Sequence, residues 1–394
     1  MTTEPTSTAS ASTEPTSTEP ISSEPIVPLA DLHLQHLVVA DVIREGFDRV
    51  LADSSFVRGP DVARFEREFA DYCGVRHTVG VGNGTDALEL ALLALDLRPG
   101  DEVLVPANTF VATAEAVVRA GARPVFVDCD DDYLIDVSSA AAAVTPRTRA
   151  VMAVHLYGQC APVEQLAAAL GPGVTIVEDA AQAQGARRFG ARAGSLGTIA
   201  GTSFYPGKNL GAYGDAGGVM TDDDELAAAV RRLGNHGGLT AYRHDVLGTN
   251  SRLDSLQAVV LSAKLAHLDD WNQQRRDAAA RYAELLDGVG GLTLPRTAPG
   301  NEHVHHLYVV RTPERDRVRA ALGGAGVATG VHYPAPVHLM APFLPESGRP
   351  RALPTAEAFA GELLTLPLFP GITAAQQEYV AEALVGALRV GALR

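Results

Sequence analysis

The chain has 394 residues, of which 46% are hydrophobic and 20% are charged, and its net charge is −15. This length allows two globular domains, and the composition is typical of a soluble globular protein. The negative charge and the lack of a basic run exclude a nucleic-acid-binding groove. No apolar run reaches membrane-spanning length, the first residues do not resemble a signal peptide, and the three cysteines have neither disulfide nor zinc spacing. We therefore expect a cytoplasmic protein.

Residues 1 to about 27 consist mainly of Thr, Ser, Glu and Pro, and they contain two related copies of TEPTST. This composition offers too little apolar surface to offset the entropy of the chain. A disordered tail without chemistry is predicted.

Two helices are predicted next, over Val38–Ala52 and Val62–Tyr72, where apolar residues recur at helical spacing. The following stretch, 77-HTVGVGNGTDALELALLAL-95, predicts a strand, a glycine-rich turn and a helix that begins at Thr85. Backbone N–H groups at such a helix start could bind a phosphate. Thr85 takes the place of the third glycine of the dinucleotide-binding pattern, so that pattern is not met, and a plain tight turn is an equally good interpretation.

Apolar strands then alternate with helical segments, which predicts an α/β domain with a mainly parallel sheet. The strands are expected at Val103–Val105, Pro124–Val127, Ala150–His155 and Val174–Val177, with a helix at Phe110–Arg119. Ligands of such sheets bind beyond the carboxyl ends of the strands. The polar residues expected at those ends are Asn108, Thr109, His155, Tyr157, Glu178, Asp179 and Ser203.

The last part of the chain predicts a long helix over Ser255–Leu286, a strand at Leu307–Arg311, and helices at Pro313–Gly323 and Ala374–Leu388. We predict a large domain over residues 28–287 and a smaller α+β domain over residues 288–394. The first residues of the large domain could pack on the small one.

Lysine occurs only twice, as Lys208 and Lys264. Lys208 lies in the glycine-rich stretch 203-SFYPGKNLGAYGDAGG-218, whose glycines would let the backbone pass close to a flat cofactor. Lys264 lies on a predicted helix near Asp269 and Asp270 and is expected to be solvent exposed. A desolvated lysine can lose its proton and form a Schiff base, which arginine cannot do. Lys208 is therefore the candidate nucleophile, with an ordinary surface lysine as the alternative.

A lysine-bound pyridoxal phosphate needs a carboxylate at its pyridine nitrogen, donors for its phosphate and a surface for stacking. Asp179 follows an apolar strand and could face the ring nitrogen, and Gln182 could reach the ring hydroxyl. Each candidate also has a structural interpretation, for example Asp179 as a helix cap. Their combination with Lys208 favours a cofactor site. The other candidates are Gly84, Thr85 and Ser203 for the phosphate and Phe110 for stacking.

Several motifs, in this order, resemble the DegT/DnrJ/EryC1/StrS family of pyridoxal-phosphate sugar aminotransferases. They are 83-NGTDALELAL-92, 106-PANTFVATAEAV-117, 124-PVFVDCD-130, 154-VHLYGQ-159, 177-VEDAAQAQGA-186, 203-SFYPGKNLGAYGDAGG-218, 234-GNHG-237 and 250-NSRLDSLQA-258. The resemblance covers roughly residues 32 to 390. It implies the fold type I, aspartate aminotransferase-like architecture, and a homodimer in which a neighbouring loop completes each site.

The resemblance also implies a role for each candidate residue. The family usually has a histidine where this chain has Gln184, which leaves the role of this position open. The implied cofactor contacts are Lys208 for the Schiff base, Asp179 for the pyridine nitrogen, Gln182 for the ring oxygen, Gly84, Thr85 and Ser203 for the phosphate, Phe110 for stacking, and Asn250 of the neighbouring subunit for the phosphate.

The segments Asn250–Asp254 and 329-TGVHYPAPVH-338 resemble family members that aminate C3 of nucleotide-linked 3-keto sugars. The implied reaction converts a dTDP-3-keto-6-deoxyhexose into the 3-amino sugar with L-glutamate as donor, in amino-deoxysugar biosynthesis. Substrate contacts would come from Tyr157, Arg252, His306, His332 and Tyr333.

Several alternatives remain open. A 4-keto or UDP-linked sugar could be the substrate on the same fold. A sugar dehydratase is disfavoured because relatives of that kind have histidine in place of Lys208, and intact Lys208 and Asp179 disfavour a non-catalytic regulatory protein. A nicotinamide-dependent oxidoreductase is disfavoured, because the sequence offers no suitably placed acidic residue to bind the ribose of that cofactor. No metal site is predicted, because His303 and His305, expected on one strand face, have no accompanying carboxylate or cysteine set.

Overall fold

The computed structural model describes residues 27–240, 242–344 and 350–392. The tail predicted over residues 1–27 therefore lies, except for Val27, outside the described residues. Within these ranges, no helix has both the length and the apolar character that crossing a membrane requires.

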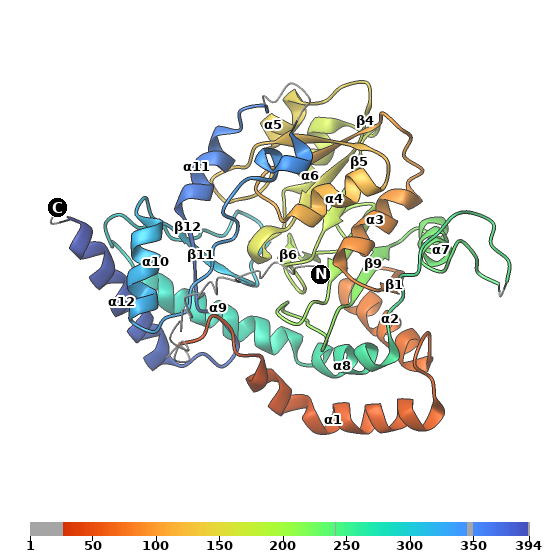
Figure 1. The fold of residues 1–394 in the computed structure, drawn as a ribbon, viewed down its shortest axis with the longest axis horizontal. Coiled ribbons are helices and arrows are strands. Elements are labelled where there is room, and N and C mark those ends of the chain that lie inside the picture. The colour runs from red at the N-terminus through yellow and green to blue at the C-terminus, as the bar shows by residue number, and fades with distance from the viewer. Residues whose placement is uncertain (1–26, 241, 345–349, 393–394) are drawn as a thin grey trace, which may run out of the picture.

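A seven-stranded sheet forms the centre of the larger part of the molecule (Figure 1). The strands from β8 to β3 run parallel, whereas β9 is antiparallel to both of its neighbours. The predicted α/β class with a mainly parallel sheet is confirmed. In the described part of the chain the strand order is β1 (His77–Val81), β9 (Gly217–Thr221), β8 (Ile199–Ser203), β5 (Thr175–Asp179), β4 (Thr148–Val154), β2 (Glu102–Pro106) and β3 (Arg123–Val127).

Helices cover both faces of this sheet, because successive residues of a strand point to opposite sides and both sets are apolar. In β2, Val103 belongs to the core between the sheet and α3, α4 and α7. Its neighbour Leu104 belongs to the core on the opposite face, between the sheet and α5 and α6. Helices α2 and α8 cover the rest of the second face, and α1 packs on α8. The bounds are α1 (Leu32–Asp53), α2 (Pro60–Cys73), α3 (Gly84–Ala94), α4 (Val111–Arg119), α5 (Val137–Ala142), α6 (Val163–Leu170), α7 (Asp224–Leu233) and α8 (Ser255–Leu265).

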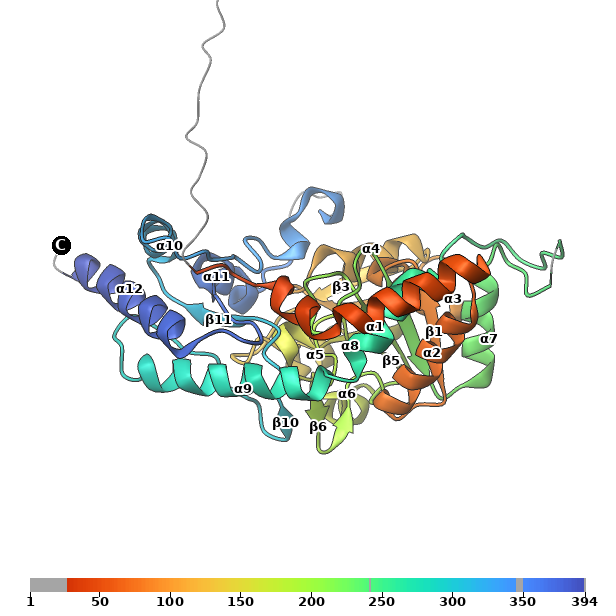
Figure 2. The same cartoon turned by 90° about the horizontal axis from the view of Figure 1, so that it is seen from below.

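A second, smaller core lies around the antiparallel pair β11 (Tyr308–Arg311) and β12 (Leu363–Leu366). Helices α10 (Arg315–Gly324) and α12 (Ala374–Ala392) pack on it, together with the C-terminal half of α9 (Leu268–Leu285). Both views show α9 running from the larger part to the smaller one, where it lies beside α12 (Figures 1 and 2). The second core thus begins within α9, before residue 288, where the small domain was predicted to start.

The remaining elements connect these two parts. Val27 pairs with the smaller part, because its N–H donates to Gly326 O (3.1 Å) and its carbonyl accepts from Ala328 N (3.0 Å). Helix α11 (Pro354–Glu362) packs against the core under α3 and α4. A small sheet contains β6 (Arg187–Arg188), β7 (Ala191–Arg192) and β10 (Asn301–Glu302), and short 3₁₀ helices cover Leu156–Gly158, Val337–Leu339 and Ala341–Phe343.

The single helix predicted over Ser255–Leu286 is wrong, because the chain forms α8 and α9 with a break at Ala266 and His267. At the break, His267 N donates to Lys264 O three residues back (3.0 Å), and the helix restarts at Leu268. The apolar periodicity continues across this break, because Leu261 before it and Leu268 after it are buried in the same core. The sequence pattern therefore could not reveal it.

The predicted exposure of Lys264 is also wrong, since only 2% of this residue is exposed. Its Nζ donates to Gly211 O (2.7 Å) and lies 4.6 Å from the centre of the Tyr213 ring. Burial lowers the pKa of Lys264 to about 8. Asp269 and Asp270, which suggested a solvated surface, belong to α9 beyond the break. Lys264 instead anchors the loop that carries Lys208.

Candidate active site

A cavity of about 850 Å³ lies at the carboxyl ends of β4, β5 and β8, next to the first turns of α3 and α4. Residues of the smaller part, including Leu366 of β12, close its other side. Parallel strands present their carboxyl ends at one edge of the sheet, which explains why distant segments meet here. Of the predicted site residues, those that line the cavity are Gly84, Thr85, Phe110, Asp179, Gln182, Ser203, Lys208, His306, His332 and Tyr333.

Lys208 lies in the loop between β8 and β9, and its backbone N–H donates to Tyr205 O (2.8 Å). Burial lowers the pKa of its side chain to about 8, and the negative charge of Asp179 opposes this shift. An ordinary lysine titrates near about 10.4. The amine of Lys208 is therefore much more readily available in its neutral, nucleophilic form.

We expect Lys208 in the cofactor-free protein to condense with an aldehyde increasingly as the pH rises through about 8, because the neutral amine is the reacting form. Borohydride trapping followed by peptide mass analysis measures this profile. Lys264 is the internal control, since its similar pKa is combined with burial that excludes the reagent. A midpoint at the value of an ordinary lysine would contradict the assignment.

Asp179 is the last residue of β5 and is buried. Its Oδ2 accepts from Thr113 Oγ1 (2.7 Å), and its Oδ1 accepts from Ala181 N (3.2 Å). The Thr113 hydroxyl in turn lies 2.7 Å from the hydroxyl of Thr109. These hydrogen bonds fix the orientation of the carboxylate, as a partner of a protonated ring nitrogen requires.

The start of α3 lies against the end of β8. Asn83 caps the helix, with its side chain accepting from Asp86 N (2.8 Å). A Cβ on Gly84 would come within 2.5 Å of Ser203 Cβ, and one on Gly217 within 2.3 Å of Asn83 O, so both positions need glycine. This close approach places the Ser203 hydroxyl beside backbone N–H groups that have no partner within the helix. Such an arrangement can bind a phosphate.

Gln182 connects two tyrosines at the cavity wall. Its Oε1 accepts from Tyr157 N (2.7 Å), and its Nε2 donates to Tyr333 OH (3.0 Å). The Tyr333 ring packs against Phe110 with 5.4 Å between ring centres, and burial raises the pKa of its hydroxyl. Tyr157 is buried behind the lining, where its hydroxyl donates to His332 O. The structure therefore places Tyr157 as a brace for the wall and not at the cavity surface where a substrate contact was predicted.

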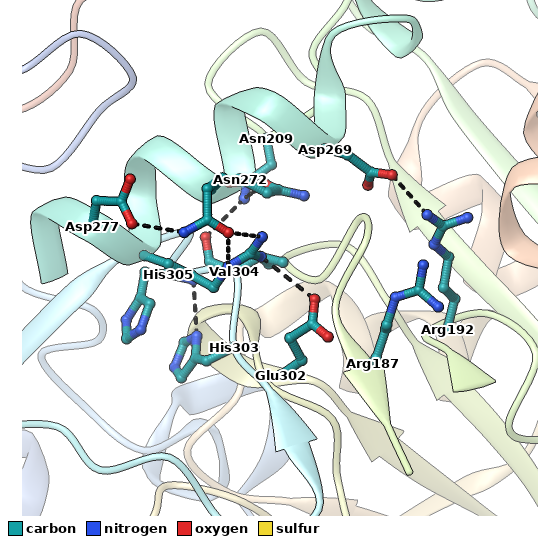
Figure 3. A network of polar contacts seen from close by, with 12 residues as sticks. Arg187, Arg192, Asn209, Asp269, Asn272, Asp277, Glu302, His303, Val304 and His305 are labelled. Atoms are coloured by element: carbon teal, nitrogen blue, oxygen red, sulfur yellow. Dashed lines mark hydrogen bonds and ion pairs between the residues drawn. The ribbon is translucent and has the colours of Figure 1, made fainter. Parts of the chain in front are cut away.

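His306 is held by a network that fixes its tautomer. Asn209 Nδ2 donates to Asn272 Oδ1 (2.8 Å) and Val304 O (3.1 Å), so Asn209 Oδ1 accepts from His306 Nδ1 (3.1 Å). Figure 3 shows Asn209, Asn272 and Val304 in this network. Burial and the nearby charges of Lys208 and Arg275 hold the pKa of His306 well below its usual value. The imidazole is neutral, and its Nε2 is an acceptor.

A second histidine in the lining is also uncharged at neutral pH. Burial, together with the charge of Lys208, lowers the pKa of His332 to about 4. Its Nδ1 lies 2.7 Å from Thr365 Oγ1 on β12. The cavity thus presents neutral imidazoles beside the reactive lysine.

The neighbouring histidines are not on a strand, so their predicted shared strand face is wrong. His303 and His305 lie between β10 and β11, with ring centres 3.9 Å apart and His305 N donating to His303 Nδ1 (2.8 Å) (Figure 3). The positive φ of His305 (41°) breaks the extended conformation. Among the described residues, no group of three or more His, Cys, Asp or Glu side chains could hold a metal ion.

Besides Tyr157, two predicted site residues do not line the cavity. Asn250 is exposed and forms an isolated β-bridge with Asn235. Arg252 lines a separate hollow of about 200 Å³ together with Arg58 and Glu66. Within one chain, neither residue reaches the Lys208 cavity.

Gln184, at the position of the usual family histidine, is buried and supports the end of β8. Its Nε2 donates to Thr202 Oγ1 (2.9 Å) and Ser203 O (2.8 Å). Gln184 does not line the cavity. Its contacts therefore support the strand that leads to Lys208.

Sequence reasoning missed Thr113, Asn209 and Arg275. Thr113 could have been found, because it lies in the first turn of the predicted helix Phe110–Arg119, directly after the polar strand-end residues Asn108 and Thr109. Asn209 follows Lys208 directly but carried no motif of its own. Arg275 is far from the other site residues in sequence, and no local pattern distinguished it from the other arginines.

The arrangement suits one class of ligand. An amine with a lowered pKa, a fixed carboxylate and a helix start beside a serine hydroxyl line the same cavity. These groups fit a flat, positively charged ring that carries an aldehyde and a phosphate, as pyridoxal phosphate does.

Comparison with known proteins gives a consistent picture. The sequence model of the DegT/DnrJ/EryC1/StrS aminotransferase family matches residues 40–385. The pleiotropic regulatory protein of Geobacillus stearothermophilus is 47% identical over 360 residues, which cover 90% of this chain and 97% of that protein. The dTDP-3-amino-3,4,6-trideoxy-alpha-D-glucose transaminase of Streptomyces venezuelae is 46% identical over 360 residues, covering 91% and 95%. The crystal structure of S. venezuelae DesV with a ketimine intermediate has a TM-score of 0.89 and 44% identity, covering 94% of this chain and 100% of that one.

Proposed function

The chain belongs to the DegT/DnrJ/EryC1/StrS aminotransferase family, and from this premise we propose that it transfers an amino group to a nucleotide-linked keto sugar. The proposed substrate is a dTDP-3-keto-6-deoxyhexose, the donor is L-glutamate, and the product is the 3-amino sugar of an amino-deoxysugar pathway. The observation that carries this proposal is the pairing, in one cavity, of a lysine of lowered pKa with a fixed carboxylate. The S. venezuelae relative, named as a dTDP-3-amino-3,4,6-trideoxy-alpha-D-glucose transaminase, supports the choice of sugar.

The proposed cofactor is pyridoxal phosphate, which supplies an electron-withdrawing ring that stabilises negative charge on the carbon losing a proton. Asp179 would hold the ring nitrogen and Gln182 the ring oxygen, while Phe110 would stack on the ring. The phosphate would be bound by Gly84, Thr85 and Ser203. The supporting observation is that all of these residues line one cavity with Lys208.

Lys208 has two tasks in this proposal: its Nζ attaches the cofactor, and after release it moves the proton. In the first half-reaction Nζ takes the proton from Cα of glutamate. In the second half-reaction it returns a proton to C3 of the sugar. A buried amine with a pKa of about 8 is suited to both directions, because neither protonation state is strongly favoured near neutral pH.

The sugar is proposed to lie against the neutral imidazoles and the tyrosine of the smaller part. His306 Nε2 would accept a hydrogen bond from a sugar hydroxyl, and His332 and Tyr333 would line the same side. The fixed tautomer of His306 supports this role, since its Nδ1 proton is already committed to Asn209. All three residues line the Lys208 cavity.

A panel of nucleotide sugars and donors tests the reaction. With pyridoxal phosphate added, we expect glutamate to convert the bound cofactor, and a dTDP-linked 3-keto sugar to restore it. UDP-linked and 4-keto sugars are the comparison substrates. Turnover of the 4-keto compounds alone would contradict amination at C3. No conversion of the cofactor by glutamate would favour a non-catalytic role, a possibility kept open by the name of the G. stearothermophilus relative.

We also propose a homodimer in which Asn250 and Arg252 of one subunit complete the cavity of the other. The loop after α7 projects from the body in both views (Figures 1 and 2), and Leu247 within it is 96% exposed. Helix α1 also exposes apolar side chains, including Leu37 (61%) and Val42 (60%). Such surfaces favour burial against another protein surface.

The proposed location is the cytoplasm. The buried, unpaired Cys73, Cys129 and Cys160 are compatible with this location.

Mixing two inactive variants tests the shared site. We expect Lys208→Ala and Asn250→Ala dimers each to have low activity, because each cavity lacks either the amine or the neighbouring loop's amide. After subunit exchange, a mixed dimer would contain one cavity with both groups intact, and activity should rise. If the mixture shows only the sum of the separate activities while exchange is verified by mass, the shared cavity is disproved.

A further inference from the structure

We propose that Arg275 binds a carboxylate of the amino donor inside the Lys208 cavity, an inference that rests on the proposed transamination. Arg275 projects from α9, is only 4% exposed, and lines the same cavity as Lys208. Among the described residues, no carboxylate lies within ion-pair distance of it, although 19 arginine–carboxylate ion pairs occur elsewhere. A buried cation without a counter-ion is costly and calls for a ligand of opposite charge.

One end of the guanidinium is already occupied. Its Nη1 donates to Leu368 O (3.0 Å), His305 O (3.3 Å) and His306 O (3.4 Å). These bonds hold the planar group in a fixed position between α9 and the smaller part. Guanidinium has five N–H donors, and those on Nε and Nη2 have no acceptor among the described residues. The Nε and Nη2 edge matches the two oxygens of a carboxylate.

Lys208 adds positive charge near Arg275, while the Asp179 carboxylate in the same cavity acts on Lys208. Burial lowers the pKa of Arg275 to about 10, which still leaves it charged at neutral pH. His306 feels the positive charges of both Lys208 and Arg275, so both cations lie close to the same imidazole. An anion bound by Arg275 would therefore lie on the Lys208 side of the cavity.

The position favours the donor over the nucleotide. Proton transfer requires Cα of glutamate to lie beside Lys208 Nζ, and a carboxylate is bonded directly to Cα. The diphosphate of a nucleotide sugar is separated from the reacting C3 by part of the sugar ring. A bound carboxylate would orient the Cα–H bond toward Lys208, because a two-point contact restricts rotation of the donor.

The test compares Arg275→Gln and Arg275→Lys with Arg276→Gln, a neighbour on the same helix whose ion pair is with Glu302 (3.7 Å). Glutarate, a dicarboxylate without an amine, is titrated into each cofactor-loaded protein by calorimetry. We expect Arg275→Gln to weaken glutarate binding about 10- to 100-fold, Arg275→Lys to weaken it less, and Arg276→Gln to leave it unchanged.

Kinetics provide the second readout. In Arg275→Gln, KM for glutamate should rise by a similar factor, while KM for the keto sugar stays the same. An unchanged glutarate affinity in both Arg275 variants, a rise in the sugar KM alone, or an equal loss in both half-reactions would overturn the proposal. If Arg275→Gln does not fold, Arg275→Lys, which keeps the charge, takes its place in the test. An unchanged glutarate affinity in Arg275→Lys would then overturn the proposal. A wild-type protein that glutamate fails to convert would refute the transamination, and the glutarate titration would still judge Arg275 separately.

Discussion

Replacing Lys208 with arginine is expected to reduce the rate of amino transfer by about 10³-fold or more. Arginine keeps a positive charge but cannot lose its proton, so it can neither attach the cofactor nor take the proton from Cα. The rate is measured as kcat with glutamate and a dTDP-linked 3-keto sugar at a fixed pH. Single-turnover conversion of the bound cofactor by glutamate should fall by a similar factor.

Chemical rescue provides the control for this substitution. In Lys208→Ala, a small added amine can enter the space that the side chain leaves and act as the base. We expect such an amine to restore part of the proton-transfer rate in Lys208→Ala but not in Lys208→Arg, where the guanidinium fills the space. A Lys208→Arg protein that keeps more than a small fraction of wild-type kcat would show that another residue moves the proton.

Replacing Asp179 with asparagine should give the second largest effect, a loss of about 10²- to 10³-fold in kcat/KM. The amide has nearly the same shape and can still accept from Thr113, but it carries no charge to stabilise a protonated ring nitrogen. Cofactor retention should also weaken, because the ring loses its ionic partner. Both quantities are measured on the same preparation, by steady-state kinetics and by the cofactor content after gel filtration.

Thr113→Val is the matched control for Asp179→Asn. It removes one hydrogen bond to the carboxylate but leaves the charge, so a loss of about 10-fold is expected. Equal losses in the two variants would mean that the Asp179 charge is not what the reaction uses. A wild-type rate in Asp179→Asn would remove Asp179 from the proposed site.

Much of the cavity could be anticipated from the sequence, because strand periodicity and sheet topology together predict where loop residues meet. Asp179 and Ser203 end parallel strands, so the α/β pattern already brought them to one edge of the sheet. The glycines near Gly84 indicated a turn between a strand and a helix, and the structure has this turn between β1 and α3. For these residues, the local sequence pattern and the general topology of a parallel sheet were sufficient to predict that they meet.

Residues whose environment depends on tertiary packing could not be predicted in this way. Lys264 looked solvated because acidic residues follow it in sequence, yet those residues lie beyond the break before α9, and the lysine is buried against Gly211 and Tyr213. Arg275 belongs to a helix whose other arginines form surface ion pairs, and only the packing of the smaller part makes its environment different. Whether a charged side chain has a counter-ion is a property of the folded arrangement.

The proposed dimer shows a related limit. Asn250 and Arg252 lie outside the cavity of their own chain, so only a second copy could bring them to one. A pattern within a single sequence marks such residues as distinctive without showing which cavity they serve.

The most direct measurement of the central claim is the covalent state of Lys208. The protein is loaded with pyridoxal phosphate, reduced with borohydride with or without prior glutamate, and digested for peptide mass analysis. We expect the cofactor mass to appear on the peptide containing Lys208, and we expect prior glutamate to abolish this label. A label on another residue, or one that glutamate leaves unchanged, would contradict the claim that Lys208 serves a transaminase.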